Sequence, residues 1–297
     1  MKRIYFIVNP HSGIGKYKQL EDKVRQYLDS TRFIYTVLYT QYRGHAVELA
    51  SQAVQEGVDI VVAVGGDGTI NEIARALVNT SVALALIPVG SGNGLAHHVH
   101  VPSSLKKAID IINQCHVEKI DTLSVNNRIC VSMAGIGFDA LIAEQFDNTG
   151  KRGFISYLKF IVKTYFVYKP HYYIMQSSPT DTREVKALMI SFANSSQWGY
   201  NVKIAPDALL QDGKADVCVV KKPPFFTLPG RVFLLLAGQL DKLKSAERIY
   251  QVQECIVYEK NKNPQSCHID GDPIERQQEI HVKVLPESLH ILTSTIN

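Results

Sequence analysis

Four apolar runs in the first third of the chain alternate with stretches in which apolar residues recur at helical spacing. The runs cover residues 4–8, 33–39, 60–64 and 82–87. Unbroken runs of this kind are typical of strands that are buried on both faces of a parallel sheet. After the third run, the apolar residues between Ile70 and Leu77 mark the buried stripe of a helix. The pattern predicts an α/β fold, a doubly wound parallel sheet with right-handed crossovers.

The pattern changes around residue 120, where turns shorten and helical periodicity mostly disappears. Strands are expected at residues 184–193, 216–220, 251–258 and 280–291. Such short strands favour an antiparallel, β-sandwich-like second domain. We place the boundary near Val125, which divides the chain into residues 1–125 and 126–297. The last strand could return to the first domain, and an active site is expected in the cleft between the two.

One amphipathic helix is expected in the second part of the chain, over residues 152–170. Its apolar side chains oppose a basic set, Lys151, Arg152, Lys159 and Lys163. Packing against the protein core is the simpler interpretation. A helix that also meets lipid is the functional alternative, which its aromatic and basic residues favour.

The third apolar run leads directly into a glycine-rich turn. Gly65, Gly66, Asp67 and Gly68 turn the chain, and the sequence from Thr69 matches a capping box, which would open the next helix. Glycines let backbone N–H groups approach an anion closely, and a helix N-terminus favours negative charge. An acidic residue in such a turn suggests a metal ion or a hydroxyl proton beside a phosphate. An ordinary tight turn is the alternative.

The other strands also end in residues suited to a phosphate. The first is followed by Asn9, Pro10, Ser12 and Gly13, the second by Thr40, and the fourth by Gly90, Ser91 and Asn93. In a doubly wound sheet these strand ends converge on one edge. Their convergence predicts a nucleotide site, which makes residues 1–125 a nucleotide-binding domain.

Composition narrows the class of protein without identifying it. Hydrophobic residues make up 45% and charged residues 20% of the 297-residue chain, as in soluble globular proteins. The net charge of +4 suits a nucleotide or an anionic membrane surface but is too weak to indicate nucleic acid. Five scattered cysteines indicate reduced thiols in a cytoplasm. No secretory signal is evident, and no apolar run approaches the ~20 residues that span a bilayer.

The motifs together resemble those of the diacylglycerol kinase catalytic superfamily, which includes bacterial lipid kinases and sphingosine kinases. The resemblance rests on GGDGT with Asn71 and Glu72, on the NPxSG-like turn at Asn9, and on the D-G-D-P turn at Asp270. The segment at residues 90–96, GSGNGLA, is similar to that of sphingosine-kinase-like members. A G-x-G-F-D-A segment at residues 135–140 also resembles the family pattern.

The resemblance implies a set of site residues. It places ATP on Asn9, Pro10, Ser12, Gly13, Thr40, Gly65, Gly66, Asp67, Gly68, Thr69, Asn71, Gly90, Ser91 and Asn93. It places Mg²⁺ on the Asp212 side chain and the carbonyl groups of Leu209 and Lys214, although a plain D-G hairpin turn would also explain that segment. Asp121 is implied in the active-site network. Asp272 and Asp67 compete for the role of proton acceptor, and we favour Asp272.

These residues predict an ATP-dependent lipid kinase that phosphorylates a hydroxyl of a membrane lipid. The resemblance leans towards sphingoid bases, with diacylglycerol, phosphatidylglycerol and isoprenoid alcohols open. Peripheral attachment to the inner face of the membrane is expected, with no nucleic-acid partner, and a homodimer remains open. An NAD-kinase-like metabolite kinase and an inactive nucleotide-binding regulator are the alternatives.

Overall fold

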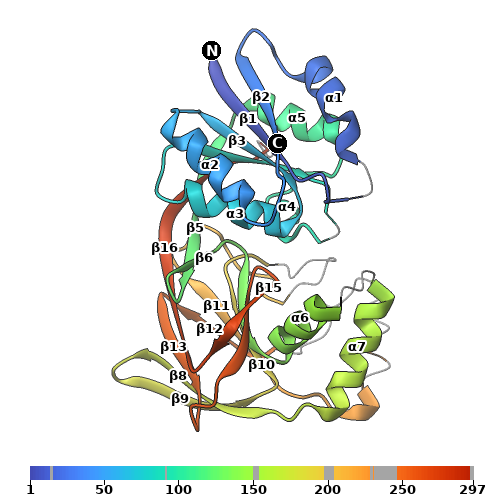
Figure 1. Ribbon diagram of the computed structural model, residues 1–297. Coiled ribbons are helices and arrows are strands. Elements are labelled where there is room, and N and C mark those ends of the chain that lie inside the picture. Colours follow the sequence, from blue (N-terminus) through green and yellow to red (C-terminus); the bar gives the residue numbers. More distant parts are fainter. Residues whose placement is uncertain are drawn as a thin grey trace.

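The computed structural model describes residues 1–13, 16–90, 92–149, 154–196, 204–227, 230 and 246–294. It shows an α/β domain stacked above a β-rich domain that carries two helices on one side (Figure 1). This architecture confirms the fold class that the sequence predicts.

The first domain is built on four parallel strands in the order β2-β1-β3-β4. These are β1 (Lys2–Val8), β2 (Phe33–Tyr39), β3 (Ile60–Gly65) and β4 (Ala83–Pro88). The helices are α1 (Leu20–Tyr27), α2 (His45–Gln55), α3 (Asp67–Leu77), α4 (Gly94–His98) and α5 (Leu105–Gln114), with a 3-10 turn η1 (Lys16–Gln19). Helix α1 packs with α5, and α2 packs with α3. Every residue of β3 and β4 is buried, as continuous apolar strands covered on both faces should be.

The second domain contains a six-stranded antiparallel sheet, β12-β11-β10-β7-β14-β15. Its strands are β7 (Met133–Gly137), β10 (Met189–Ala193), β11 (Ala215–Val220), β12 (Ala246–Val252), β14 (Gln265–Ile269) and β15 (Asp272–Gln277). A larger sheet faces it and contains β5 (Val117–Val125), β6 (Arg128–Cys130), β8 (His171–Ser178), β9 (Asp181–Ala187), β13 (Glu254–Glu259) and β16 (Glu279–Leu292). Buried residues of both sheets form one core cluster.

Strand β16 connects the two domains. It pairs with β13 in the lower half of the molecule and with β5 along most of its length, and its Ile291 pairs in parallel with Leu84 of β4 (Figure 1). The larger sheet therefore has ten strands and runs through both domains. Because one strand belongs to both domains, this continuity sets how the edge of the parallel sheet faces the second domain.

Two strands expected from the sequence are each two strands in the structure. The run at 184–193 contains the end of β9 and all of β10, and the run at 251–258 contains the end of β12 and most of β13. Each break moves the chain from one sheet to the other. The first single-strand prediction was wrong because apolar residues continue from Ala187 through Met189 while the chain switches sheets. The second was wrong because it took Gln253 and Glu254 as part of one strand, although the chain switches sheets there as well.

Helices α6 (Phe138–Thr149) and α7 (Phe154–Val167) cover one side of the second domain, beside a 3-10 turn η2 (Phe225–Thr227). Buried Tyr165 of α7 packs with Leu188, Met189 and Val220, so the helix has a core-facing side. It ends at Val167, earlier than the expected residue 170. Lys151 and Arg152 lie outside the described residues. No helix among the described residues is long and apolar enough to span a membrane.

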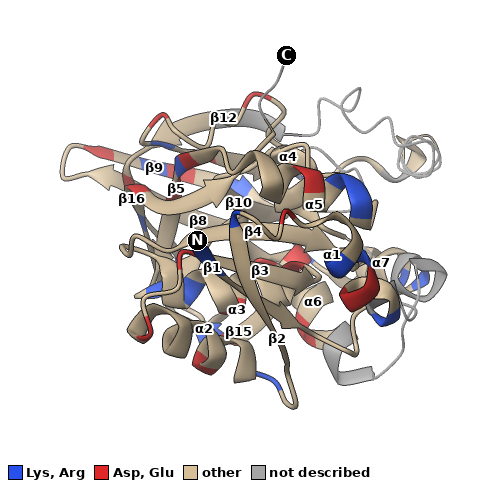
Figure 2. Cartoon of the chain, turned by 90° about the horizontal axis from the view of Figure 1, so that it is seen from above, with Lys and Arg blue, Asp and Glu red and all other residues tan. Residues whose placement is uncertain are grey.

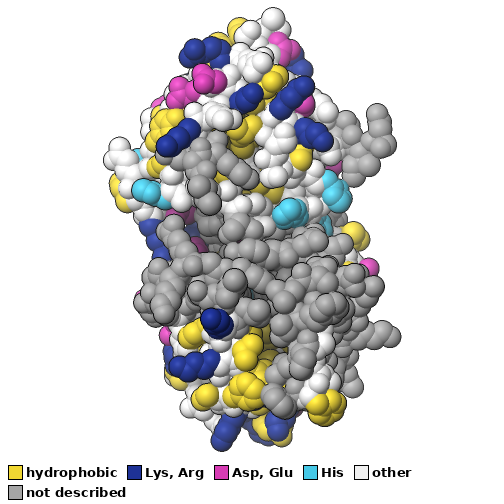
Figure 3. Space-filling view, turned by 90° about the vertical axis from the view of Figure 1, so that its right-hand side faces the viewer, with side chains coloured by type: hydrophobic (Ala, Val, Ile, Leu, Met, Phe, Trp, Pro, Cys, Tyr) yellow, Lys and Arg dark blue, Asp and Glu magenta, His cyan; other side chains and the backbone are white. Residues whose placement is uncertain are grey.

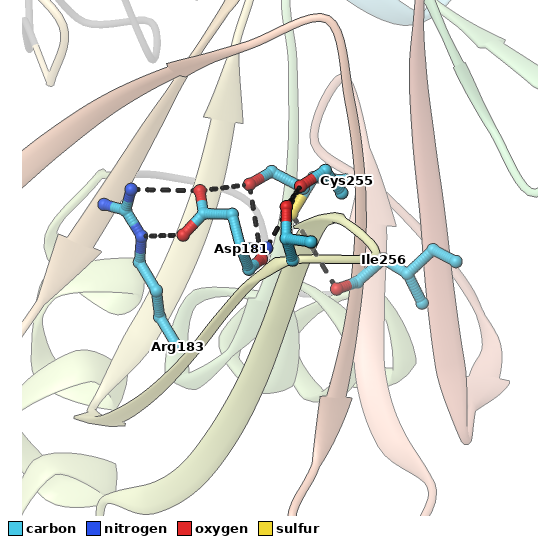
Figure 4. Close-up of polar contacts among 7 residues, drawn as sticks. Asp181, Arg183, Cys255 and Ile256 are labelled. Atoms are coloured by element: carbon cyan, nitrogen blue, oxygen red, sulfur yellow. Dashed lines mark hydrogen bonds and ion pairs between the residues drawn. The ribbon is translucent and has the colours of Figure 1, made fainter.

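The described cysteine thiols are free, and four of them are buried. Cys255 lies on β13, the strand that pairs with β8, near the ion pair of Asp181 and Arg183 (Figure 4). Burial raises the pKa of the Cys255 thiol to about 11. A thiol with such a pKa is not a nucleophile at neutral pH, so this cysteine serves packing.

Candidate active site

The turns that follow β1, β3 and β4 meet at one edge of the parallel sheet. The backbone N–H of Asn9 donates to the Val64 carbonyl at 2.9 Å, and its Nδ2 donates to the Thr69 hydroxyl at 3.1 Å. The first turn is thereby fixed to the end of β3 and to the start of α3. Thr40, at the end of β2, donates its N–H to the Val8 carbonyl and is buried beside them.

Glycine is required where these turns touch one another. A Cβ on Gly90 would lie 2.6 Å from the Gly66 Cα, and a Cβ on Gly13 would lie 2.3 Å from the Val89 carbonyl oxygen. Gly13 also has a φ of +66°, a conformation that side chains rarely allow. The three turns therefore pack backbone against backbone, and glycines line the surface where they meet.

The start of α3 differs from the predicted capping box. The helix begins at Asp67 with Gly66 as its N-cap, so Thr69 already lies inside the first turn. Its hydroxyl accepts from Asn9, and the Glu72 carboxylate accepts from the Gly44 N–H at 3.0 Å. The capping-box prediction was wrong because both side chains bond to neighbouring turns instead of to their own helix end.

The Asp67 carboxylate holds the next turn in place. Its two oxygens accept from the backbone N–H groups of Asn93 and Gly94, both at 2.7 Å. Burial raises the pKa of the Asp67 carboxyl above its ordinary value, and the two N–H donors oppose that shift. Both oxygens are thus engaged within the protein, which makes Asp67 a brace between the β3 and β4 turns.

Asn93 gives this surface an unused polar atom. The residue is buried, its Nδ2 donates to the Gly90 carbonyl at 2.8 Å, and its Oδ1 has no hydrogen-bond partner among the described residues. A buried polar atom without a partner is costly. A ligand hydroxyl or amino group at this edge would satisfy it. Ser91, the neighbouring predicted residue, lies outside the described residues.

The hairpin between β14 and β15 brings the second domain onto α3. The Asp270 carboxylate accepts from the backbone N–H groups of Val131, Ser132 and Met133 at 2.8–2.9 Å. It also accepts from the Asn71 amide on α3. Asn71 was predicted to contact nucleotide; in the structure its amide joins the two domains. Sequence reasoning missed this role of Asp270, because its partners lie far away in the chain.

Asp272 is the first residue of β15, directly after the turn of this hairpin, and it lies above the first turn of α3. A Cβ on Gly68 would be 3.8 Å from the Asp272 Oδ2, and the Arg43 guanidinium lies 3.5 Å from the same oxygen. Both charged side chains are partly exposed. The structure therefore brings a carboxylate of the second domain to the glycine turns of the first. Arg43 was not predicted; its position three residues after Thr40 was the available signal.

Asp121 and the predicted metal turn lie together on another side of the domain junction. The buried Asp121 carboxylate accepts from the Gly213 N–H at 2.7 Å and from the Glu287 N–H at 2.8 Å. The Asp212 carboxylate accepts from the Lys214 N–H at 3.0 Å, and Leu209 is exposed. Asp121 thus braces the turn that carries the predicted ligands, with both of its own oxygens occupied.

Away from these turns the described residues offer no second site of comparable character. Among the described residues, no group of three or more His, Cys, Asp or Glu side chains could hold a metal ion. A cavity of about 310 Å³ lies between the β8–β9 hairpin and β12, lined by residues such as Asp181 and Arg183. Those two side chains already neutralise each other, and none of the predicted site residues lines this cavity.

Fold and site together define a two-domain α/β protein. In it, the β14–β15 hairpin of the second domain brings Asp270 and Asp272 to the glycine-lined edge of the parallel sheet. The chain belongs to the diacylglycerol kinase catalytic superfamily. Residues 3–125 match the diacylglycerol kinase catalytic domain, and residues 132–293 match the YegS C-terminal NAD kinase beta sandwich-like domain. The family resemblance of the sequence motifs is confirmed, and membership of this superfamily supports a kinase-type function.

Bacterial diacylglycerol kinases align with most of this chain. A diacylglycerol kinase of Staphylococcus carnosus is 27% identical over 84% of this chain and 82% of its own length. One from Staphylococcus aureus is 28% identical over 86% of this chain and 81% of its own. The crystal structure of a diacylglycerol kinase from Bacillus anthracis has a TM-score of 0.76 at 19% identity, covering 99% of this chain and 97% of that one. The structural likeness shows the fold alone.

Proposed function

We propose that the protein is an ATP-dependent lipid kinase that transfers the γ-phosphoryl group to a hydroxyl of a membrane lipid. The observation that carries the proposal is the position of Asp272, a carboxylate of the second domain held over the first turn of α3. A helix N-terminus beside glycine turns is suited to phosphate. A carboxylate facing that position from the other domain is suited to an acceptor hydroxyl.

Each group of the site would then have one task. The turns at Gly66 and Gly90 would hold the ATP phosphates with backbone N–H groups. Asp272 would accept the proton of the lipid hydroxyl while the hydroxyl oxygen attacks the γ-phosphorus and ADP leaves. Arg43, beside Asp272, would place a positive charge near the transferring group. Asp67 and Asp121 would fix the geometry of these parts, since their oxygens are already occupied.

The turn at residues 208–214 fits a divalent cation. Burial raises the pKa of the neighbouring Asp216, and the negative charges of Asp212 and Asp207 raise it further. Hard cations prefer such oxygen-rich, negative surroundings. Asp212 with the carbonyls of Leu209 and Lys214 would hold Mg²⁺. The cation would supply positive charge at the junction of the domains, which Asp121 connects to this turn.

Replacing Asp212 by alanine is expected to raise the Mg²⁺ concentration needed for half-maximal activity by roughly tenfold or more, because the one proposed carboxylate ligand is lost. Titration of activity with Mg²⁺ measures this directly. The stabilisation of the protein against heat by Mg²⁺ should weaken in parallel. This second measurement does not depend on activity. Gln211→Ala, in the same turn, should leave both unchanged. An Asp212→Ala variant with normal magnesium dependence would return this segment to a plain hairpin turn.

The outer side of α7 offers a surface for a lipid bilayer. Val162, Phe166 and Val167 are exposed, with Lys159 and Lys163 beside them, and Phe226 of η2 is 81% exposed. On the lower part of the face that carries α7, hydrophobic side chains lie beside basic ones (Figure 3). Seen from above, basic and acidic residues of the rest of the described chain are interspersed (Figure 2). An apolar patch with lysines suits an anionic membrane.

Replacing Lys159 and Lys163 together by alanine is expected to weaken binding to phosphatidylglycerol vesicles by roughly tenfold or more, since each basic residue near an anionic surface contributes about 1 kcal/mol. Sedimentation with vesicles measures the binding, which should also weaken as salt is added. The double variant Lys107→Ala and Lys283→Ala, with exposed lysines on other elements, is the control. Binding that ignores both salt and the α7 lysines would exclude this surface.

A panel of acceptors tests the proposed function against its alternatives. ADP formation should require diacylglycerol, a sphingoid base, phosphatidylglycerol or an isoprenoid alcohol in mixed micelles. Turnover with soluble NAD and without lipid would indicate the metabolite-kinase alternative. ATP binding without turnover on any acceptor would indicate an inactive regulator.

A further inference from the structure

A buried acid–histidine pair lies beneath the hairpin that carries Asp272. The Asp139 carboxylate, at the start of α6, is 3.0 Å from the His268 Nε2 on β14. Each side chain is only 4% exposed. Neither residue takes part in the steps described above. Two buried ionisable groups in contact are costly to maintain unless they are mutually satisfied.

The hydrogen bonds of the hairpin determine how this pair is protonated. The backbone N–H of Gly271 points to the other imidazole nitrogen, Nδ1, at 3.3 Å. A backbone N–H can only donate, so His268 Nδ1 must carry no proton. The imidazole proton is then on Nε2 and is donated to Asp139. The N-terminal turn of α6 stabilises the negative charge of that carboxylate.

The neighbouring strand leaves room for the pair. A Cβ on Gly135 of β7 would lie 2.2 Å from the Asp139 Oδ2 and 2.5 Å from the His268 Nε2. Any side chain at this position would displace the two polar groups from each other. The first glycine and the aspartate of the G-x-G-F-D-A segment thus serve one arrangement.

The hairpin itself is held at two points. Asp270 and Gly271 have φ values of +51° and +86°, as in a two-residue hairpin turn, and Asp272 is the next residue. On one side the Asp270 carboxylate accepts three backbone N–H groups of residues 131–133. On the other side Gly271 donates to His268. These two attachments set the direction in which the Asp272 side chain leaves the strand.

We propose that Asp139 and His268 are positioning residues for phosphoryl transfer: Asp139 fixes the His268 tautomer, and His268 Nδ1 fixes the turn that presents Asp272. The inference rests on the proposed function, in which Asp272 accepts the proton of the acceptor hydroxyl. A base must lie within about 2.6–3.2 Å of the proton it takes, so a small rotation of the turn suffices to lower turnover. ATP is held by other residues and should be bound normally.

The tautomer is the first test, and it does not depend on activity. Long-range ¹H–¹⁵N spectra of the ¹⁵N-histidine-labelled protein distinguish the two neutral tautomers and the imidazolium. We expect the ring proton of His268 on Nε2, with Nδ1 unprotonated. A proton on Nδ1, or a charged ring, would contradict the proposal, since neither can accept from Gly271.

Substitution kinetics are the second test. In His268→Gln the side-chain amide can still reach Asp139, but the turn loses its acceptor. Turnover should fall roughly tenfold or more, with the KM for ATP unchanged within twofold. In His268→Asn the carbonyl oxygen can take the place of Nδ1 and should restore part of the turnover. Asp139→Asn, which preserves volume, should lower turnover in the same direction as His268→Gln, because an amide oxygen is a weaker acceptor for the Nε2 proton than the charged carboxylate.

A double-mutant cycle with Asp272→Asn separates positioning from general stability. If His268 acts through Asp272, adding His268→Gln to Asp272→Asn should change turnover by less than twofold. Full additivity of the two losses, or normal turnover of both His268→Gln and Asp139→Asn, would overturn the positioning role. An inactive wild-type protein, or a fully active Asp272→Asn variant, would instead contradict the proposed function, and either is visible before His268 is changed. If His268→Gln does not fold, Asp139→Asn carries the same cycle.

Discussion

Replacing Asp272 by asparagine is expected to lower the turnover number by roughly 10²–10⁴-fold, the usual contribution of a positioned general base. Asparagine has nearly the same shape but cannot take a proton from the acceptor hydroxyl. The residue comes from the second domain and lies over Gly68 without belonging to the glycine turns. ATP affinity should therefore change little.

Steady-state kinetics with isothermal titration of ATP distinguish the two candidate bases. Asp67→Asn should damage both turnover and ATP affinity, because the new amide would place a donor against the N–H groups of Asn93 and Gly94. The opposite pattern would require exchanging the roles. That pattern is near-normal turnover for Asp272→Asn together with an inactive Asp67→Asn that binds ATP normally.

Replacing Gly90 by alanine is expected to reduce ATP affinity at least roughly tenfold while the protein stays folded. The added Cβ would lie 2.6 Å from the Gly66 Cα, and a backbone atom cannot move aside as a flexible side chain can. The turns after β3 and β4 would separate, and their N–H groups would no longer converge on one phosphate. Gly66→Val should abolish ATP binding, because its branched side chain would extend from a Cβ that already lies 3.4 Å from the Gly90 Cα.

Isothermal titration measures the affinity, and far-ultraviolet circular dichroism checks the fold. Gly230→Ala is a suitable control, because a Cβ there meets no atom of the described residues within 4 Å. Unchanged ATP affinity in Gly90→Ala and Gly66→Val would remove the glycine turns from the nucleotide site.

The parallel sheet could be predicted because its signals are local. An unbroken apolar strand such as β3 reports burial on both faces, and the glycines that follow it report a turn. Four strand ends at one edge then predict a shared site without any knowledge of tertiary contacts. The same local signals failed at residues 188 and 253, where the chain changes sheets. Apolar residues continue past the first break, and two polar residues, Gln253 and Glu254, did not mark the second as the end of a strand.

The partners of individual side chains could not be predicted, because they lie far away in the sequence. Thr69 and Glu72 match a capping box, yet their bonds go to Asn9 and Gly44. The Asp270 carboxylate bonds to residues 131–133. A motif gives the residue types that a site needs. Only the fold decides which of two carboxylates is enclosed by backbone N–H groups and which, like Asp272, lies beside Arg43 above the first turn of α3.

The fate of the γ-phosphate tests the central claim most directly. The protein is incubated with Mg²⁺, anionic vesicles that contain a lipid alcohol, and ATP labelled with ³²P at either the γ- or the α-position. The lipid is then extracted. If the protein is a lipid kinase with Asp272 as its base, the lipid should carry label from γ-labelled ATP alone, and Asp272→Asn should abolish that label. Label that stays in the aqueous phase for every lipid alcohol, or transfer that persists undiminished in Asp272→Asn, would contradict it.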